Sequence, residues 1–198
     1  MISGIVLAAG TSSRMGRPKQ LLALGDTTLL RHVVGTALGS ALDEVVVVLG
    51  HASEEIAATL PSDPRLRIVR NPRFDEGQST SLRAGLLAMG DATEAAVVLL
   101  GDQPGVTASA ISAVIGEYQR TGASIVQASY DGRPGHPTLL AAQLWPEASS
   151  ITGDEGARGV IDAHPADRTL VEIGGDPPHD VDTEADYRRV RLAFEDRD

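Results

Sequence analysis

The chain of 198 residues contains no cysteine. Disulfide bonds, thiolate zinc sites and cysteine nucleophiles are therefore excluded. Aromatic residues are scarce as well, with one Trp, three Tyr and two Phe. Because large aromatic side chains are so few, the core of this protein must be built from Val, Leu, Ile and Ala.

Long hydrophobic runs are also missing. The longest, Ala95–Leu100, is far too short to cross a bilayer, and no charged segment leads into an apolar stretch as in a signal peptide. The formal net charge of −10 repels nucleic acid and anionic membranes, so neither is expected as a partner. A local basic pocket for a small anion is still compatible with this charge. We expect a cytoplasmic protein that is a monomer or a weak oligomer.

Strand-like apolar runs alternate with amphipathic helical patterns along the chain. The expected strands are Gly4–Ala9, Val45–Leu49, Arg67–Arg70, Ala95–Leu100 and Ala123–Ala128, and the expected helices are Thr27–Leu38, Ser81–Met89 and Ala108–Tyr118. This alternation predicts one domain over residues 1–198, an α/β fold of three layers with a mainly parallel, doubly wound sheet. Ligands bind at the carboxyl ends of the strands in such sheets.

The C-terminal part shows a different pattern. Pro134–Leu140 predicts a short extended piece, and Ile151–Ala163 predicts a loop followed by a helix. Thr183 and Asp186 have the spacing of a capping box, which predicts a final amphipathic helix after them. We expect Glu195–Asp198 to be frayed.

A loop rich in Gly, Ser and Thr, residues 10–19, follows the first expected strand, and we call it the phosphate loop. It carries three basic side chains, Arg14, Arg17 and Lys19. Its pattern, Leu-Ala-Ala-Gly-x-Ser-x-Arg-Met-Gly-x-x-Lys, is neither a Walker A loop nor a Rossmann fingerprint. Free backbone N–H groups and fixed cations at a strand end are typical of polyphosphate binding. Arg14 can form two bonds to phosphate oxygens, and Lys19 supplies a mobile charge. The alternative is a Gly-rich turn with solvated cations.

Acidic residues at two places could hold a metal ion. Asp102 directly follows the apolar run that ends at Leu100, at the strand end where the phosphate loop is expected. Mg²⁺ in nucleotidyl transfer takes one or two carboxylates together with phosphate oxygens. Asp180 and Asp182 are two candidates for the second carboxylate. A simple turn at Asp102 and a helix cap near Asp182 are the alternatives.

Three further segments could bind a substrate. Ser79 and Ser81 stand at the start of an expected helix, where hydroxyls and free N–H groups can bind an anion or a base edge, although one residue there is expected to cap the helix. His136 lies in a Gly- and Pro-rich loop, and Arg158 ends the sequence Gly-Asp-Glu-Gly-Ala-Arg. A structural histidine and a solvated arginine are the alternatives. The other four histidines show no spacing typical of metal ligands.

Together, these motifs resemble those of the MobA-like nucleotidyltransferases, the family that includes the molybdenum cofactor guanylyl- and cytidylyltransferases. The resemblance implies the nucleotide-diphospho-sugar transferase type of fold and a loop that wraps a nucleoside triphosphate. It implies nucleotide contacts from Leu7, Ala8, Ala9, Gly10, Ser12, Arg14, Lys19, Ser79 and Ser81. It also implies that Asp102 and Asp182 bind the metal and that His136 and Arg158 contact the acceptor. Thr80, Phe74 and Glu184 depart mildly from the family pattern.

The resemblance implies a magnesium-dependent transfer of CMP from CTP to molybdopterin or molybdenum cofactor, with release of pyrophosphate. Lys19 would stabilise the α-phosphate, Arg14 the leaving pyrophosphate, and Asp102 the metal. The alanine at position 9 resembles the residue found there in the cytidylyl branch, since the guanylyl branch usually has Gly at this position. The alternatives are the same chemistry with GTP or on a sugar phosphate, and a non-catalytic carrier that hands the cofactor to a molybdenum hydroxylase.

Overall fold

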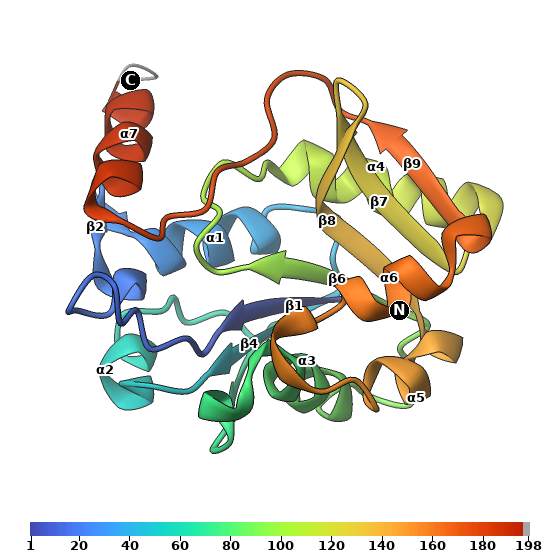
Figure 1. Cartoon of the computed structure of the whole chain (residues 1–198), viewed down its shortest axis with the longest axis horizontal. Helices are drawn as coiled ribbons and strands as arrows, with labels where there is room; N and C mark the ends of the chain where they lie inside the picture. Colours follow the sequence, from blue (N-terminus) through green and yellow to red (C-terminus); the bar gives the residue numbers. More distant parts are fainter. Residues whose placement is uncertain (196–198) are drawn as a thin grey trace.

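A central seven-stranded sheet organises the protein, for which a computed structural model describes residues 1–195 (Figure 1). Its strands are β1 Ile2–Ala8, β4 Glu44–Leu49, β5 Leu66–Arg70, β6 Ala95–Leu100, β7 Ile125–Tyr130, β8 Arg133–Ala141 and β9 Arg168–Glu172. The order across the sheet is β5-β4-β1-β6-β8-β7-β9. Strand β8 runs antiparallel to both neighbours, whereas the other adjacent pairs are parallel. The predicted mainly parallel sheet is therefore confirmed.

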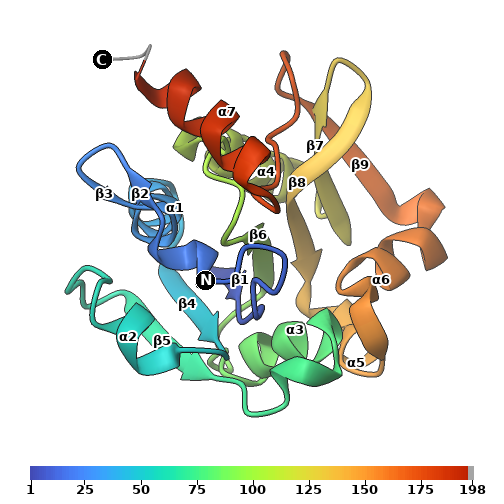
Figure 2. The ribbon, with the colours of Figure 1, turned by 60° about the vertical axis from the view of Figure 1, so that its left-hand side comes forward.

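Helices cover both faces of this sheet (Figure 2). They are α1 Leu29–Leu38, α2 Ser53–Ala57, α3 Gln78–Leu87, α4 Ala108–Thr121, α5 Trp145–Ala148, α6 Arg158–Ala163 and α7 Glu184–Glu195. Apolar residues of α1, α2 and α4 pack in one core cluster, and those of α3, α5 and α6 pack in the cluster on the opposite face. The doubly wound, three-layer arrangement predicted from the alternation is confirmed.

Strand β1 lies inside the sheet, between β4 and β6, and contributes to both cores. All seven of its residues are buried. Ile5 faces the cluster with α3, while its neighbour Val6 faces the cluster with α1 and α4, because successive strand residues point to opposite faces. This buried position places the carboxyl end of β1, and the loop after it, in the middle of one sheet edge.

A third cluster joins the C-terminal helix to a small hairpin formed by β2 (Ala23–Leu24) and β3 (Thr27–Thr28). The Tyr187 hydroxyl of α7 donates to the carbonyl of Ala23 at 2.7 Å. The predicted capping box is present, since Asp186 N donates to Thr183 Oγ1 at 3.2 Å and Thr183 N donates to Asp186 Oδ2 at 2.9 Å. The segment that precedes α7 is thereby fixed close to the phosphate loop.

Several elements differ from the expectation. The hairpin β2–β3, helix α2 and edge strand β9 were not predicted, because they are short and carry no long apolar run. The expected helix from Thr27 begins at Leu29, since Thr28 caps it by accepting from Arg31 N at 3.3 Å. The segment Glu195–Asp198 was expected to be frayed. Glu195 is the last residue of α7, and residues 196–198 lie outside the described part of the chain.

Membrane insertion through a helix finds no support in residues 1–195. None of the helices described there combines the length and the apolar character that a membrane span requires.

Candidate active site

The site forms where β1 and β6 end. These strands are parallel neighbours, with Leu7 opposite Leu100, so the loop after β1 and Asp102 after β6 emerge at the same edge. The segment before α7 joins them, because Val181 N donates to the carbonyl of Asp102 at 3.0 Å. Asp182 is thereby placed beside Asp102 although 80 positions of sequence separate them.

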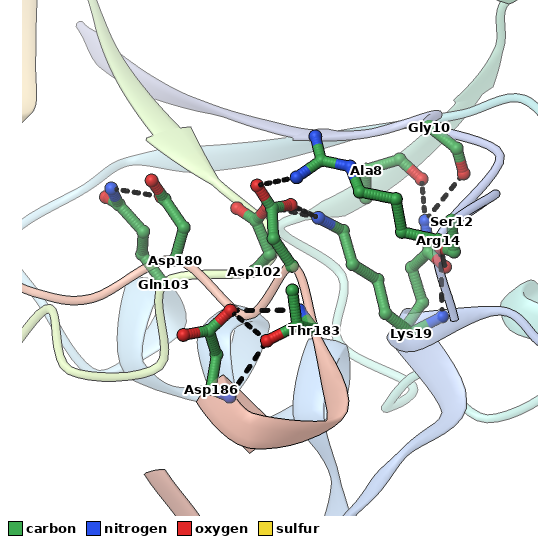
Figure 3. Close-up of polar contacts among 12 residues, drawn as sticks. Ala8, Gly10, Ser12, Arg14, Lys19, Asp102, Gln103, Asp180, Thr183 and Asp186 are labelled. Atoms are coloured by element: carbon green, nitrogen blue, oxygen red, sulfur yellow. Dashed lines mark hydrogen bonds and ion pairs between the residues drawn. The ribbon is translucent and has the colours of Figure 1, made fainter. Parts of the chain in front are cut away.

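The ammonium of Lys19 lies between two carboxylates (Figure 3). Its Nζ is 2.5 Å from Asp102 Oδ2 and 2.9 Å from Asp182 Oδ1. Arg14 Nη1 donates to Asp182 Oδ2 at 3.2 Å. The Lys19 side chain is 15% exposed and that of Asp102 is 19% exposed, whereas Arg14 is 71% exposed. Lys19 and Asp102 thus form the sheltered centre of the site, and Arg14 lies at its open rim.

Burial and charge act on these groups in opposite directions. Burial would lower the pKa of Lys19, but the charge and hydrogen bond of Asp102, assisted by Asp182, outweigh burial and raise that pKa. Burial raises the pKa of Asp102 although Lys19 opposes the shift. The hydrogen bond from Lys19 lowers the pKa of the more exposed Asp182. Asp102 is therefore a carboxylate that needs a cation beside it.

A glutamine that sequence reasoning missed holds the phosphate loop in shape. Gln20 is 3% exposed, and its Nε2 donates to the carbonyls of Ala8 at 2.9 Å and Gly10 at 3.2 Å. Ser12 accepts from the backbone N of Lys19 at 3.0 Å. These bonds tie the two ends of the loop together. The only sequence signal was a polar residue directly after the loop lysine, which by itself does not indicate burial.

A cavity of about 420 Å³ lies over this loop and the end of β6. Of the residues predicted to contact nucleotide, those that line it are Leu7, Ala8, Ala9, Gly10, Lys19 and Ser81. Ser12 instead supports the loop, and Arg14 lies outside the lining. Ser79 is 2% exposed, and its hydroxyl has no hydrogen-bond partner among residues 1–195. We call this cavity the nucleotide half of the cleft.

The start of α3 differs from the expectation that a hydroxyl residue caps it. Gly77, at φ 110°, occupies the N-cap position and offers no side chain. Asp154, from the Gly-Asp-Glu-Gly-Ala-Arg segment, supplies an oxygen that accepts from Gln78 N at 3.2 Å. A Cβ on Gly77 would lie 2.5 Å from the backbone of Gly153. The two loops therefore approach each other too closely for any residue except glycine.

A second cavity of about 710 Å³ adjoins the first. Leu7, Gln78, Leu100 and Asp154 line both, so the two cavities are adjacent, and we call them together the cleft. His136 and Arg158, predicted to contact the acceptor, both line the second cavity. We call this cavity the acceptor half of the cleft.

His136 lies within strand β8 rather than in a loop. Its Nδ1 is 3.3 Å from the carbonyl oxygen of Val98, and burial lowers its pKa. A neutral imidazole whose Nδ1–H donates to that carbonyl leaves Nε2 as an acceptor. The Tyr130 hydroxyl donates to the His136 carbonyl at 2.7 Å, which fixes the backbone at this point.

The carboxylates on each side of Lys19 fit a divalent cation. A single Nζ contacts both Asp102 and Asp182, so one small cation can contact both as well, and carboxylate oxygens are the ligands that Mg²⁺ and Mn²⁺ prefer. Asp180, the other candidate, instead accepts from Gln103 Nε2 at 2.8 Å. Within the described part of the chain, no group of three or more His, Cys, Asp or Glu side chains is placed to hold a metal ion. Backbone carbonyls, neutral side chains, substrate and water are the sources left for further ligands.

Comparison with known proteins agrees with this geometry. A family model described as MobA-like NTP transferase domain matches residues 4–169. Nicotine blue oxidoreductase of Paenarthrobacter nicotinovorans is 34% identical, with 92% of each chain covered. Purine catabolism protein PucB of Bacillus subtilis is 30% identical over 96% of each. Molybdenum cofactor cytidylyltransferase of Escherichia coli is 31% identical over 71% of this chain and 70% of the relative.

Solved structures share the architecture as well. The homologue of Rv0371c from Mycobacterium sp. strain JC1 has a TM-score of 0.89 at 34% identity, covering 100% of this chain and 98% of that one. Rv0371c of Mycobacterium tuberculosis, solved as a complex with manganese, has a TM-score of 0.82 at 30% identity, covering 96% and 97%. CMP:2-keto-3-deoxy-manno-octonic acid synthetase in complex with CTP has a TM-score of 0.77 at 15% identity, covering 99% of each chain, which shows a shared fold.

Proposed function

Because the chain belongs to the MobA-like NTP transferase family, we propose that it transfers CMP from CTP to the phosphate of a molybdopterin-type acceptor, with Mg²⁺ as its cofactor. The observation that carries this proposal is the position of Lys19 Nζ between Asp102 and Asp182. This charge cluster lies beside a cleft with room for two substrates. The similarity to a molybdenum cofactor cytidylyltransferase supports the choice of nucleotide and acceptor.

In the proposed reaction, an oxygen of the acceptor phosphate attacks the α-phosphorus of CTP. The new P–O bond forms as the bond from the α-phosphorus to the bridging oxygen breaks, and pyrophosphate leaves with the electron pair. A phosphate dianion is already a nucleophile near neutral pH, so no general base is required. Catalysis then depends on positioning and on neutralising charge. Lys19 would stabilise the α-phosphate, and Arg14 at the open rim would contact the leaving pyrophosphate.

Asp102 and Asp182 would hold the divalent cation. When bound, this ion draws negative charge from the triphosphate. Both carboxylates already pair with cationic side chains in the structure, so their environment favours a bound positive charge. The manganese complex of one solved relative supports a divalent metal, and Mg²⁺ is the ion that we propose.

In the acceptor half of the cleft, we propose that Arg158 binds the acceptor phosphate and that His136 contacts the ring system. Both residues line this cavity. The groups that the site presents are suited to phosphates and a cation. For this reason we favour nucleotidyl transfer over the redox activity in the name of the Paenarthrobacter relative.

The test is a pyrophosphate-release assay with Mg²⁺, each of the four nucleoside triphosphates, and molybdopterin or molybdenum cofactor as acceptor. We expect turnover with CTP. Turnover with GTP instead would support the same mechanism and contradict the prediction from Ala9 that the nucleotide is CTP. If no triphosphate is turned over, sugar phosphates are the next acceptors to assay. Failure with these as well, together with tight cofactor binding, would favour a carrier that serves a molybdenum hydroxylase.

A further inference from the structure

Gln127 is a buried polar residue in the acceptor half of the cleft whose side-chain oxygen lacks a partner among the described residues. It belongs to β7, is 8% exposed and lines the cavity. Its Oε1 is shielded from solvent and has no hydrogen-bond partner among residues 1–195, so the amide must turn toward the cavity to pair with a ligand. A buried amide that is left unpaired costs stability, so native proteins rarely retain one without a reason. A ligand that pairs with the amide when it enters the cavity would be such a reason.

The backbone irregularity opposite Gln127 gives the cavity its shape. Gln127 faces Thr138 on β8, whereas the next residue, Ala128, faces Gly135. His136 and Pro137 are therefore additional residues on β8, and they form a bulge. Bulges redirect side chains and are frequent beside active sites. Here the bulge brings His136 and Gln127 to the same cavity.

Other residues that line this cavity also carry neutral hydrogen-bonding groups. His136 contributes an imidazole whose Nδ1 is 3.3 Å from the carbonyl oxygen of Val98, which leaves Nε2 as an acceptor in the neutral form. Gln103 is 7% exposed and donates to Asp180, while its own Oε1 has no partner within the described residues. Arg158 and Arg168 supply the positive charges of the cavity, and its lining also includes the carboxylates Asp154, Glu155, Asp162 and Asp180. Besides these charged groups, the cavity presents amides suited to a neutral polar edge.

We infer that Gln127 is a specificity residue that hydrogen-bonds the lactam edge of a planar heterocyclic acceptor. A lactam presents a ring N–H beside a C=O, and a carboxamide presents the complementary C=O and N–H, so two hydrogen bonds form at once. The inference rests on the proposed function and refines it, because a pterin carries this edge and a sugar phosphate does not. A site built to bond such an edge rejects acceptors that lack it.

The test is a fluorescence titration of the full-length protein with 6-hydroxymethylpterin, a pterin without phosphate. Gln127→Leu removes both hydrogen bonds and keeps a similar volume. We expect its Kd to rise about tenfold or more, which corresponds to roughly 1.4 kcal/mol. We also expect its Tm to be equal to or higher than that of the wild type, because an unpaired buried amide is removed. A residue with a merely structural role would lower Tm instead.

The matched control is Thr138→Val. Thr138 is fully buried opposite Gln127, its hydroxyl is also unpartnered in the described chain, and it does not line the cavity. We expect this variant to bind the pterin as the wild type does. The inference is overturned if Gln127→Leu binds as tightly as the wild type, if Thr138→Val weakens binding equally, or if the wild type does not bind the pterin.

The pyrophosphate-release assay separates this inference from the proposed function. If the protein turns over molybdopterin but Gln127→Leu does not weaken pterin binding, the inference is overturned and the proposed function is retained. Pterin binding that depends on Gln127, without turnover on molybdopterin, would support the inference and overturn the function.

Discussion

Lys19 is the residue on which the charge balance of the site depends. Its ammonium contacts Asp102 and Asp182 in the structure, and it is also the group that we propose for the α-phosphate. When it contacts a phosphate, the positive charge that it supplies to the carboxylates has to be replaced, because burial disfavours the charged form of Asp102. Binding of the nucleotide and of a cation should therefore depend on each other.

The first prediction at this scale concerns Asp102→Asn. The rate of pyrophosphate release should fall about a thousandfold, since losing a ligand to a catalytic cation removes roughly 4 kcal/mol of transition-state stabilisation. The free energy of unfolding should change by only about 1 kcal/mol, because the carboxylate is itself costly to bury and Lys19 keeps Asp182 as its partner. Steady-state kinetics and urea unfolding measure the two effects.

Asp176→Asn is the matched control, because Asp176 is 84% exposed and pairs with Arg133 at the surface. It should retain wild-type activity. Near-normal turnover of Asp102→Asn would contradict the assignment of the site.

The second prediction concerns the methyl group of Ala9, which is 5% exposed and lines the nucleotide half of the cleft. Ala9→Gly should raise the ratio of kcat/KM for GTP to that for CTP by about tenfold, since one methyl in a pocket changes discrimination by roughly 1–3 kcal/mol. Competition between the two nucleotides measures this ratio. Ala37→Gly removes a methyl that packs in the core and does not line either cavity, and it should leave the ratio unchanged. An unchanged ratio in Ala9→Gly would remove the structural basis for preferring CTP.

At the scale of elements, His164 joins three segments around the acceptor half of the cleft. It follows α6, the helix that carries Arg158. Its Nε2 is 2.8 Å from Glu147 Oε2 on α5, and its Nδ1 is 3.3 Å from Asp167 Oδ2 before β9. The hydrogen bond that His164 donates to Glu147, together with Asp167, raises the pKa of His164 above its ordinary 6.5.

This raised pKa leads to a third prediction. The protonated form is favoured in the folded state, so its stabilising effect is fully present below pH 6.5 and is lost as the pH rises through the raised value. His164→Gln should therefore lower Tm at pH 5.5 and have less effect at pH 8.5. Thermal unfolding followed across this range measures the change. Glu147→Gln should remove most of the pH dependence, and a Tm difference that is equal at both pH values would contradict the prediction.

At the scale of the whole molecule, two cores share one sheet. Leu30 of α1 and Leu82 of α3 are fully buried on opposite faces, and β1 contributes side chains to both cores. Because every central strand links the two layers, we predict that residues 1–198 unfold as a single cooperative domain.

The fourth prediction tests this coupling with Leu30→Ala and Leu82→Ala. Each should lower the free energy of unfolding by about 3–5 kcal/mol, the range for a leucine deleted from a rigid core. Both should shift the same urea transition, whether it is followed by far-UV circular dichroism or by fluorescence of the single tryptophan, Trp145. Two separate transitions in either variant would show that the faces unfold independently.

Much of the architecture could be predicted from the sequence, because its signals are local. The apolar runs that became β1, β4 and β6 mark strands covered on both faces, and their alternation with helices implies parallel pairing. The phosphate loop and Asp102 were identifiable because each directly follows such a run. The carboxyl ends of parallel neighbours meet at one edge, so the sequence predicts that these two candidates lie together.

Only the tertiary structure decided which distant residues complete the site. It brought Asp182 rather than Asp180 to Lys19, supplied Asp154 as the cap of α3, and turned Gln127 into the acceptor cavity beside a bulge. Each outcome depends on how one segment packs against another far away in the chain, and neither residue type nor local spacing carries that information. The sequence by itself determined the alternation of strands and helices and the chemistry of the phosphate loop. Long-range packing determined the partners of that loop and the shape of the acceptor half of the cleft.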